Sequence, residues 1–232
     1  YRIKYVGPSQ KGAGKRLVAN QDLRDLRHSL EVFHGNPHAG NQAITMAWPH
    51  LSHPDRNVRY AARLAIENQP VSLWQERVLR EEDQRALIHA SIALCRHGDP
   101  SLSHRILKKL NQIPFDSLAA EDQLALLRAY SLCFIRLGQP APALINVVIG
   151  NLDPFFPADD EQVNTELCRV LSYLDAPQVV KKTISLMKTT ETRTLDYDKE
   201  MLSRHEYGKE ILKTMANTPN SQNIQYAYSL RR

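Results

Sequence analysis

The sequence predicts an all-α protein, a right-handed α-solenoid in which antiparallel helix pairs are stacked along the chain. Apolar residues recur at helical spacing, and helix-ending residues followed by proline recur at intervals typical of stacked helical hairpins. Apolar residues make up 42% of the chain, which is enough for a core, yet no run of about 18 apolar residues predicts a membrane span. We expect the solenoid over 20–232 and the end of a preceding domain, with a linker, over 1–19.

Residues 48–70 carry the pattern most clearly, as the end of one helix, a tight turn and a second helix. Pro54 ends the first helix because its ring removes a backbone donor and pushes His53 toward extended geometry. Asp55 can then accept hydrogen bonds from the free amides of the next turn. A helix is expected over about 56–68, where the apolar stripe consists of Val58, Ala61, Ala62, Ala65 and Ile66.

Prolines mark the junctions between helices, each preceded by glycine or a substitute that can end a helix. They are Pro37, Pro70, Pro100, Pro140 and Pro177, and subtraction gives spacings of 33, 30, 40 and 37 residues. At fixed positions before each of the last four prolines the sequence repeats the same kinds of residue, so the helices before them bury the same face. Six positions before stand Leu64, Leu94, Phe134 and Leu171; nine before stand Ala61, Ser91, Ser131 and Cys168; ten before stand Tyr60, Ala90, Tyr130 and Leu167.

The helices follow in order from the periodicity. The first is expected over about 20–34, with Gly35 as its stop and Asn36-Pro37 opening the next. Further helices are expected over about 72–80, 83–97, 100–112, 121–137, 141–152, 161–174 and 177–188. Residues 153–157 predict a stop with an aromatic plug, and Asp159, Asp160 and Glu161 suit the start of the following helix.

The two ends of the chain depart from this regularity. Residues 1–7 alternate apolar and polar like a strand of a preceding domain, so Tyr1 is interpreted as the cut edge of a larger protein. Residues 189–198 predict an exposed loop, 199–216 one helix, and Pro219 the opening of a final helix. The array is also expected to continue past the end of this sequence.

The turn with proline and aspartate, followed by Val58-Arg59 and spaced alanines, resembles a HEAT repeat. The resemblance implies that Val58-Arg59 opens the second helix of a pair. It also implies that Arg59, with Asp55, ties one repeat to the next. The acidic residue usual six positions before the arginine is here His53, so another group must pair with Arg59.

A closer resemblance covers most of the chain. Residues 26–35, 48–49 and 55–63 resemble the HEAT-rich segment of large multidomain bacterial proteins, notably of planctomycete type, and 164–174, 206–211 and 224–231 are similar to its later blocks. The resemblance implies a segment between a sugar-dehydrogenase-like β-propeller and a c-type haem domain, in an exported, periplasmic or extracytoplasmic protein. These blocks carry no catalytic residues, so the neighbours' activity is not transferred to this chain.

The charge and the reactive side chains indicate no catalytic, metal or cofactor site. The net charge of +5 is spread along the chain, with small clusters only at 11–16 and Lys181-Lys182, so nucleic-acid binding is not favoured. His34/His38 and His50/His53 have metal-ligand spacing, but helix ends interrupt both pairs. Three cysteines without a close pair in the sequence predict buried, unreactive thiols: Cys95, Cys133 and Cys168. Trp48 and Trp74 are expected in the core.

The leading hypothesis is a non-catalytic helical-repeat scaffold that spaces or docks neighbouring domains and protein partners. Its alternatives are a nucleic-acid-binding HEAT-like module and an accessory part of a propeller and haem oxidoreductase. A concave binding surface would lie on the second helices of the pairs. Its exposed candidates, suited to carboxylate or phosphate groups, are Arg59, Arg63, Arg96, Arg128 and Arg136.

Overall fold

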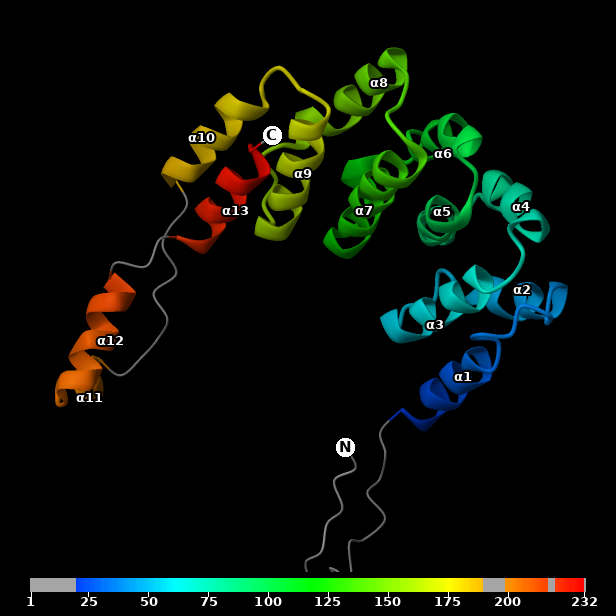
Figure 1. The fold of residues 1–232 in the computed structure, drawn as a ribbon, viewed down its shortest axis with the longest axis horizontal. Helices are drawn as coiled ribbons and strands as arrows, with labels where there is room; N and C mark the ends of the chain where they lie inside the picture. Colours follow the sequence, from blue (N-terminus) through cyan, green and yellow to red (C-terminus); the bar gives the residue numbers. More distant parts are fainter. Residues whose placement is uncertain (1–19, 190–198, 217–219, 232) are drawn as a thin grey trace, which may run out of the picture.

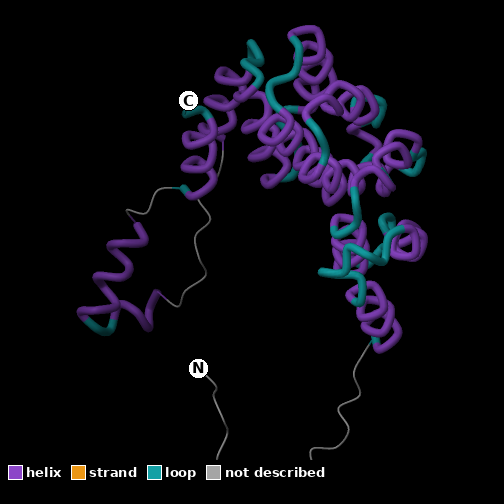
Figure 2. Tube along the Cα trace, turned by 45° about the vertical axis from the view of Figure 1, so that its right-hand side comes forward, coloured by secondary structure: helices purple, strands orange, loops and turns teal. Residues whose placement is uncertain are grey.

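The computed structural model describes residues 20–189, 199–216 and 220–231. Within these ranges the chain is all-helical and contains no strand, as Figure 2 shows, which confirms the predicted all-α class. The expected N-terminal strand and linker over 1–19 and the junction at Pro219 lie outside the described residues. So does the expected loop over 189–198, except for Thr189, which ends a helix. No helix in the described ranges combines the length and the apolar character needed to cross a membrane.

The helices form a curved array with an inner and an outer layer (Figure 1). Consecutive helices of the inner layer pack side by side: α1 (Gln21–Glu31), α3 (Arg56–Glu67), α5 (Gln84–His97), α7 (Ala120–Leu137), α9 (Glu161–Tyr173) and α13 (Ser221–Ser229). The outer layer covers them on the convex side with α2 (Asn41–Ala47), α4 (Gln75–Arg80), α6 (Ser103–Leu110), α8 (Pro142–Leu152) and α10 (Val179–Thr189). The concave side is therefore lined by the inner layer alone.

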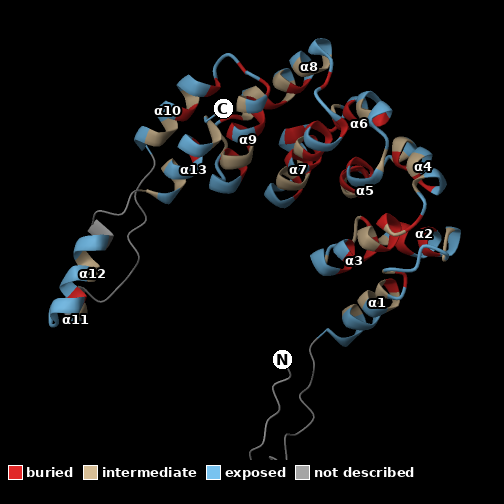
Figure 3. Cartoon of the chain, viewed as in Figure 1, coloured by how far each residue is buried: buried red, intermediate tan, exposed pale blue. Residues whose placement is uncertain are grey.

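The core lies between the layers and between neighbouring inner helices (Figure 3). The apolar stripe predicted on α3 is buried, since none of its five members is more than 2% exposed. Trp48 and Trp74 are buried as expected, and their indole N–H groups donate to Glu81 Oε2 at 2.6 Å and Gln69 O at 3.2 Å. The positions six, nine and ten residues before the last four prolines lie in α3, α5, α7 and α9, and most of them are buried. Tyr60, which is 54% exposed, is the clear exception.

The helix expected to open at Asn36-Pro37 begins instead at Asn41. Gln69, from the following helix pair, is 3% exposed and holds the intervening turn. Its side chain accepts from Gly40 N at 2.7 Å and donates to Asn36 O at 3.0 Å. The prediction of the boundary was wrong because a distant side chain supplies the hydrogen bonds that a helical turn would otherwise have made.

The other predicted helices are present with shifted ends. Short 3-10 turns, Val71–Leu73 and Pro100–Leu102, precede α4 and α6. The predicted aromatic plug is confirmed: Phe156 is 2% exposed, and the ring of Phe155 lies 5.5 Å from that of Phe115. Further 3-10 turns are Trp48–His50, Phe115–Ser117 and Asp153–Phe155.

The last inner position is filled by a helix that returns after an insertion. The expected single helix over 199–216 is two helices, α11 (Lys199–Ser203) and α12 (Glu206–Ala216), which pack against each other. After them α13 packs against α9 and α10. Gln222 Nε2 donates to Thr165 Oγ1 at 2.7 Å, and Asn223 Nδ2 donates to Met187 O at 3.1 Å. The chain thus resumes the array with α13.

Candidate functional site

Arg59 lies inside the array. Its side chain is 3% exposed; Nη1 donates to His53 O at 2.7 Å and to Pro54 O at 2.8 Å, while Nη2 forms an ion pair with Glu121 at the start of α7. The partner that the sequence left open is therefore the main chain of the preceding turn together with a carboxylate from a later helix. Because its guanidinium is buried, the expectation that Arg59 belongs to an exposed binding surface is wrong.

Aspartates cap three of the inner helices. Asp55 accepts from Asn57 N and Val58 N, Asp83 from Ala86 N, and Asp160 from Gln162 N and Val163 N. The two amide hydrogen bonds hold the pKa of Asp55 below its ordinary value, because they stabilise the charged carboxylate. The capping role expected for Asp55 is confirmed. The acidic residues 159–161 lie at the start of α9 as expected, and Asp160 also caps it.

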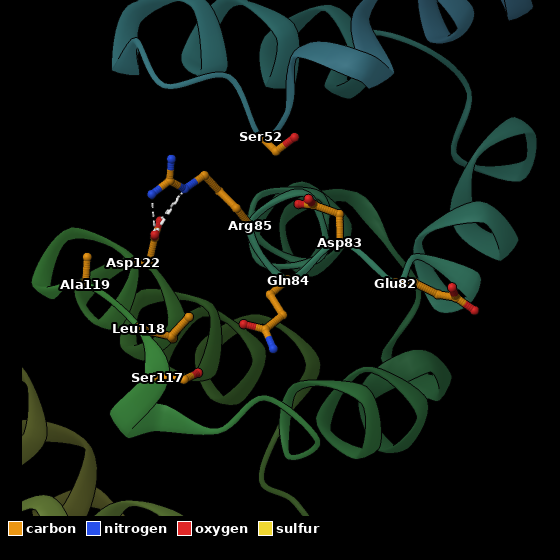
Figure 4. Close-up of a pocket in the computed structure, with 9 residues that line it drawn as sticks. All are labelled: Ser52, Glu82, Asp83, Gln84, Arg85, Ser117, Leu118, Ala119 and Asp122. Carbon is orange, nitrogen blue, oxygen red and sulfur yellow. Dashed lines mark hydrogen bonds and ion pairs between the residues drawn. The ribbon is translucent and has the colours of Figure 1, made fainter.

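An open hollow of about 650 Å³ lies where α5 and α7 begin (Figure 4). Several of its polar groups have structural partners: Arg85 Nε donates to both carboxylate oxygens of Asp122, at 2.9 and 3.0 Å, and Asp83 caps α5. Ser117 Oγ donates to Pro114 O at 2.7 Å. The lining residues are Ser52, Glu82, Asp83, Gln84, Arg85, Ser117, Leu118, Ala119 and Asp122. These contacts fix the starts of α5 and α7.

Three arginines lie close together on the inner helices, and two of them contact one carboxylate. Glu67, whose side chain is 3% exposed, contacts Arg63 Nε through Oε1 at 3.1 Å. Its other oxygen, Oε2, lies 3.2 Å from Arg96 Nη1 and 3.5 Å from His97 Nε2. Arg96 and Arg128 also lie close enough to Arg63 for their charges to act on it. The three arginines lie in three different repeats of the sequence, and the stacking of α3, α5 and α7 brings them together.

The positive charge of this cluster is only partly balanced. Burial lowers the pKa of Arg63, and the charges of Arg96 and Arg128 lower it further, while Glu67 opposes the change. Arg128 is exposed and pairs with no carboxylate among the described residues. Arg136, in the last turn of α7, is exposed and likewise has no ion-pair partner within the described ranges.

Exposed apolar side chains flank the arginines. Tyr60 is 54% exposed and lies under the guanidinium of Arg63, with Arg63 Cζ 5.1 Å from its ring centre. Ile135 is 70% exposed, and Tyr173 is 46% exposed while its ring stacks on Phe134 at 5.4 Å. Since the outer layer and neighbouring helices cover their other sides, the exposed faces of α3, α5, α7 and α9 point to the concave side. We call this surface the inner-face row: Tyr60, Arg63, Arg96, Arg128, Ile135 and Tyr173.

His89 lies on α5, beneath the inner-face row. It is on the same face of the helix as Arg96, because the two residues are seven positions apart. Burial lowers its pKa to about 4, and the charges of Arg59 and Arg63 contribute. Its buried Nδ1 has no hydrogen-bond partner among the described residues. His89 is thus neutral at neutral pH and adds no charge to the cluster.

The remaining sequence candidates have structural surroundings. His34 Nε2 lies 2.9 Å from Ala61 O, and His53 Nδ1 accepts from Asp55 N at 3.0 Å. No group of three or more potential metal ligands occurs in the part of the chain that the structure describes. The three cysteines are buried, as predicted, but the structure brings Cys95 and Cys133 into contact across α5 and α7, which their spacing in the sequence did not reveal.

Sequence reasoning missed Glu67, His89 and the apolar members of the row. A signal was available in α7, where Glu121, Arg128 and Ile135 are seven residues apart and so share one face of an otherwise apolar helix. Two polar or charged side chains at that spacing predict which face stays in solvent. This signal identifies the exposed face of each helix separately. Only the packing of the helices shows that these faces lie next to one another in a row.

The fold and this surface define a curved, two-layered, all-helical protein with a basic and apolar concave face. The chain matches no protein-family model, no curated protein and no solved structure.

Proposed function

We propose that this chain is a non-catalytic helical-repeat scaffold that docks a protein partner, or a neighbouring domain, on its concave side. The observation that carries the proposal is the inner-face row, in which Arg96, Arg128 and two tyrosines stay exposed beside Ile135. Arg63, expected from the sequence to be exposed, has a side chain that is only 14% exposed and lies below them. Arginine and tyrosine are enriched where protein interfaces gain most of their binding energy. A stack of helices that each contact only their neighbours is suited to hold such a surface.

The use of the other polar groups supports a scaffold over an enzyme. Arg59, Arg85 and Asp122 are engaged in ion pairs between inner helices, and the capping aspartates are engaged with helix amides. Groups committed to such contacts stabilise the stack and are not poised to exchange protons with a substrate.

We further propose that the stack is a right-handed, HEAT-like α-solenoid. The proline junctions and the Val58-Arg59 helix start support this assignment. The resemblance noted from the sequence would put the scaffold between a propeller and a haem domain of an exported protein, where a rigid spacer sets the distance between its neighbours. Small-angle scattering that fits a compact sphere would contradict the solenoid.

Site-specific photo-crosslinking in cells tests the docking function. A photoreactive amino acid in place of Tyr60 is expected to form a defined adduct with one protein or one neighbouring domain, identified by mass spectrometry. The matched control carries the same amino acid in place of Lys108, which is exposed on α6 of the outer layer. Equal adducts from both positions would contradict docking on the concave side, and adducts with nucleic acid would favour the nucleic-acid alternative.

A further inference from the structure

We infer that the inner-face row binds an acidic, extended segment of a partner protein that also carries apolar side chains. Arg96 and Arg128 would take its carboxylates, and Ile135 and Tyr173 would contact its apolar side chains. The inference rests on the proposed docking function and adds the chemistry of the occupant.

The balance of charge points to a carboxylate ligand. Arg63 and Arg96 share one carboxylate, Glu67, whose side chain is 3% exposed, and Arg128 adds a third positive charge close to Arg63. Like charges held together destabilise a folded chain unless opposite charge is supplied. Arg128 is exposed and pairs with no carboxylate in the described ranges, so its guanidinium can take both oxygens of an incoming carboxylate.

The apolar neighbours of the row favour a peptide over a nucleic acid. Ile135 is 70% exposed two helical turns from Arg128, and Tyr173 presents a ring already stacked on Phe134. A nucleic-acid backbone is bound mainly through its phosphates and would gain nothing from Ile135. A peptide with alternating acidic and apolar side chains can use both kinds of contact.

The spacing of the helices sets the length of the occupant. Packed helices lie about 8–10 Å apart, so the three steps from α3 to α9 span roughly 24–30 Å. An extended chain advances about 3.3 Å per residue, which corresponds to roughly seven to nine residues. A segment of that length would reach from Tyr60 to Tyr173 across the arginines.

A binding experiment with the full chain of 232 residues tests the inference. The probe is a labelled nine-residue peptide that alternates glutamate and leucine, and binding is measured by fluorescence anisotropy at physiological salt. The comparison probes are a lysine–leucine peptide, a glutamate–serine peptide and a single-stranded oligonucleotide of the same length. We expect the glutamate–leucine peptide to bind tightest and the lysine–leucine peptide not to bind.

Two variants separate the contributions of charge and apolar contact. Arg128→Glu is expected to weaken binding of the glutamate–leucine peptide by about tenfold or more, because it replaces attraction by repulsion. Lys108→Glu makes the same charge change on the outer layer and should leave binding unchanged. Ile135→Ser should weaken the glutamate–leucine peptide but not the glutamate–serine peptide. Both changes are at exposed positions, and circular dichroism checks that the variants remain folded.

The outcomes separate this inference from the proposed function. Equal binding by wild type and Arg128→Glu, no binding of the glutamate–leucine peptide, or tighter binding of the oligonucleotide would overturn it. If Tyr60 still crosslinks to one protein in that case, docking stands and only the chemistry of the occupant is wrong. If the crosslink also fails, both proposals fail.

Discussion

Arg59 joins the turn before α3 to the start of α7, 62 residues further along the chain. We expect Arg59→Ala to lower the free energy of unfolding by about 1–3 kcal/mol, because His53 O, Pro54 O and Glu121 lose their common donor. Urea denaturation followed by circular dichroism measures the change. Arg56→Ala, at an exposed position in the same helix, should change stability by less than about 0.5 kcal/mol. Similar losses in the two variants would contradict the structural role of Arg59.

His89 makes stability depend on pH. In the folded chain its pKa falls to about 4 from the ordinary 6.5, so the unfolded chain takes up a proton first as the pH drops. The stability that neutral His89 contributes is therefore complete above about pH 6.5 and is lost between about pH 6.5 and 4. The loss is on the order of 3 kcal/mol, since one pKa unit corresponds to about 1.4 kcal/mol.

Unfolding free energies measured across this window check the prediction. His89→Gln should flatten the pH dependence, whereas the exposed His104→Gln should keep the wild-type slope. If His104→Gln removed the pH dependence of the unfolding free energy and His89→Gln did not, His89 would not be the group responsible for it.

The cysteine thiols are expected not to react in the folded protein. All three thiols are buried, which shields them from a reagent in solution. Contact with Cys133 and burial raise the pKa of Cys95, burial raises the pKa of Cys168, and the contact with Cys95 lowers the pKa of Cys133. All three thiols should resist Ellman's reagent in buffer and react after denaturation with guanidinium. Rapid reaction of one thiol without denaturant would mean that α5, α7 or α9 is more open than described.

The residues that cap the helix starts each contribute to the free energy of unfolding, and their contributions can be measured one at a time. Asp160 caps α9, and its neighbour Asp159 is exposed without that role. Asp160→Ala is expected to lower the unfolding free energy by about 1 kcal/mol, because two amides lose their acceptor. Asp160→Asn should retain most of the stability, since asparagine also caps. Asp159→Ala is the control, and an equal loss there would point to a general charge effect at the helix start.

The whole array should tolerate removal of the inserted helices. The start of α13 lies near the end of α10, as the contact between Asn223 and Met187 shows, so a short glycine–serine linker can replace 190–219. We expect the shortened chain to lose the circular dichroism of the removed helices and to keep its melting temperature within a few degrees. α9, α10 and α13 would still pack together. A much lower melting temperature would show that α11 and α12 support the array.

The sequence alone determined which segments are helical and how several of them begin and end. The apolar stripe of α3, the Asp55 cap and the proline junctions are local signals, because a helix depends on residues three or four apart and on its own ends. The tertiary structure alone decided the late start of α2, the return of α13 to α9, the burial of Arg59 and the meeting of Arg63, Arg96 and Arg128. Each of these features depends on a partner about thirty or more residues away in the chain. A local sequence pattern does not show which distant residues will be in contact.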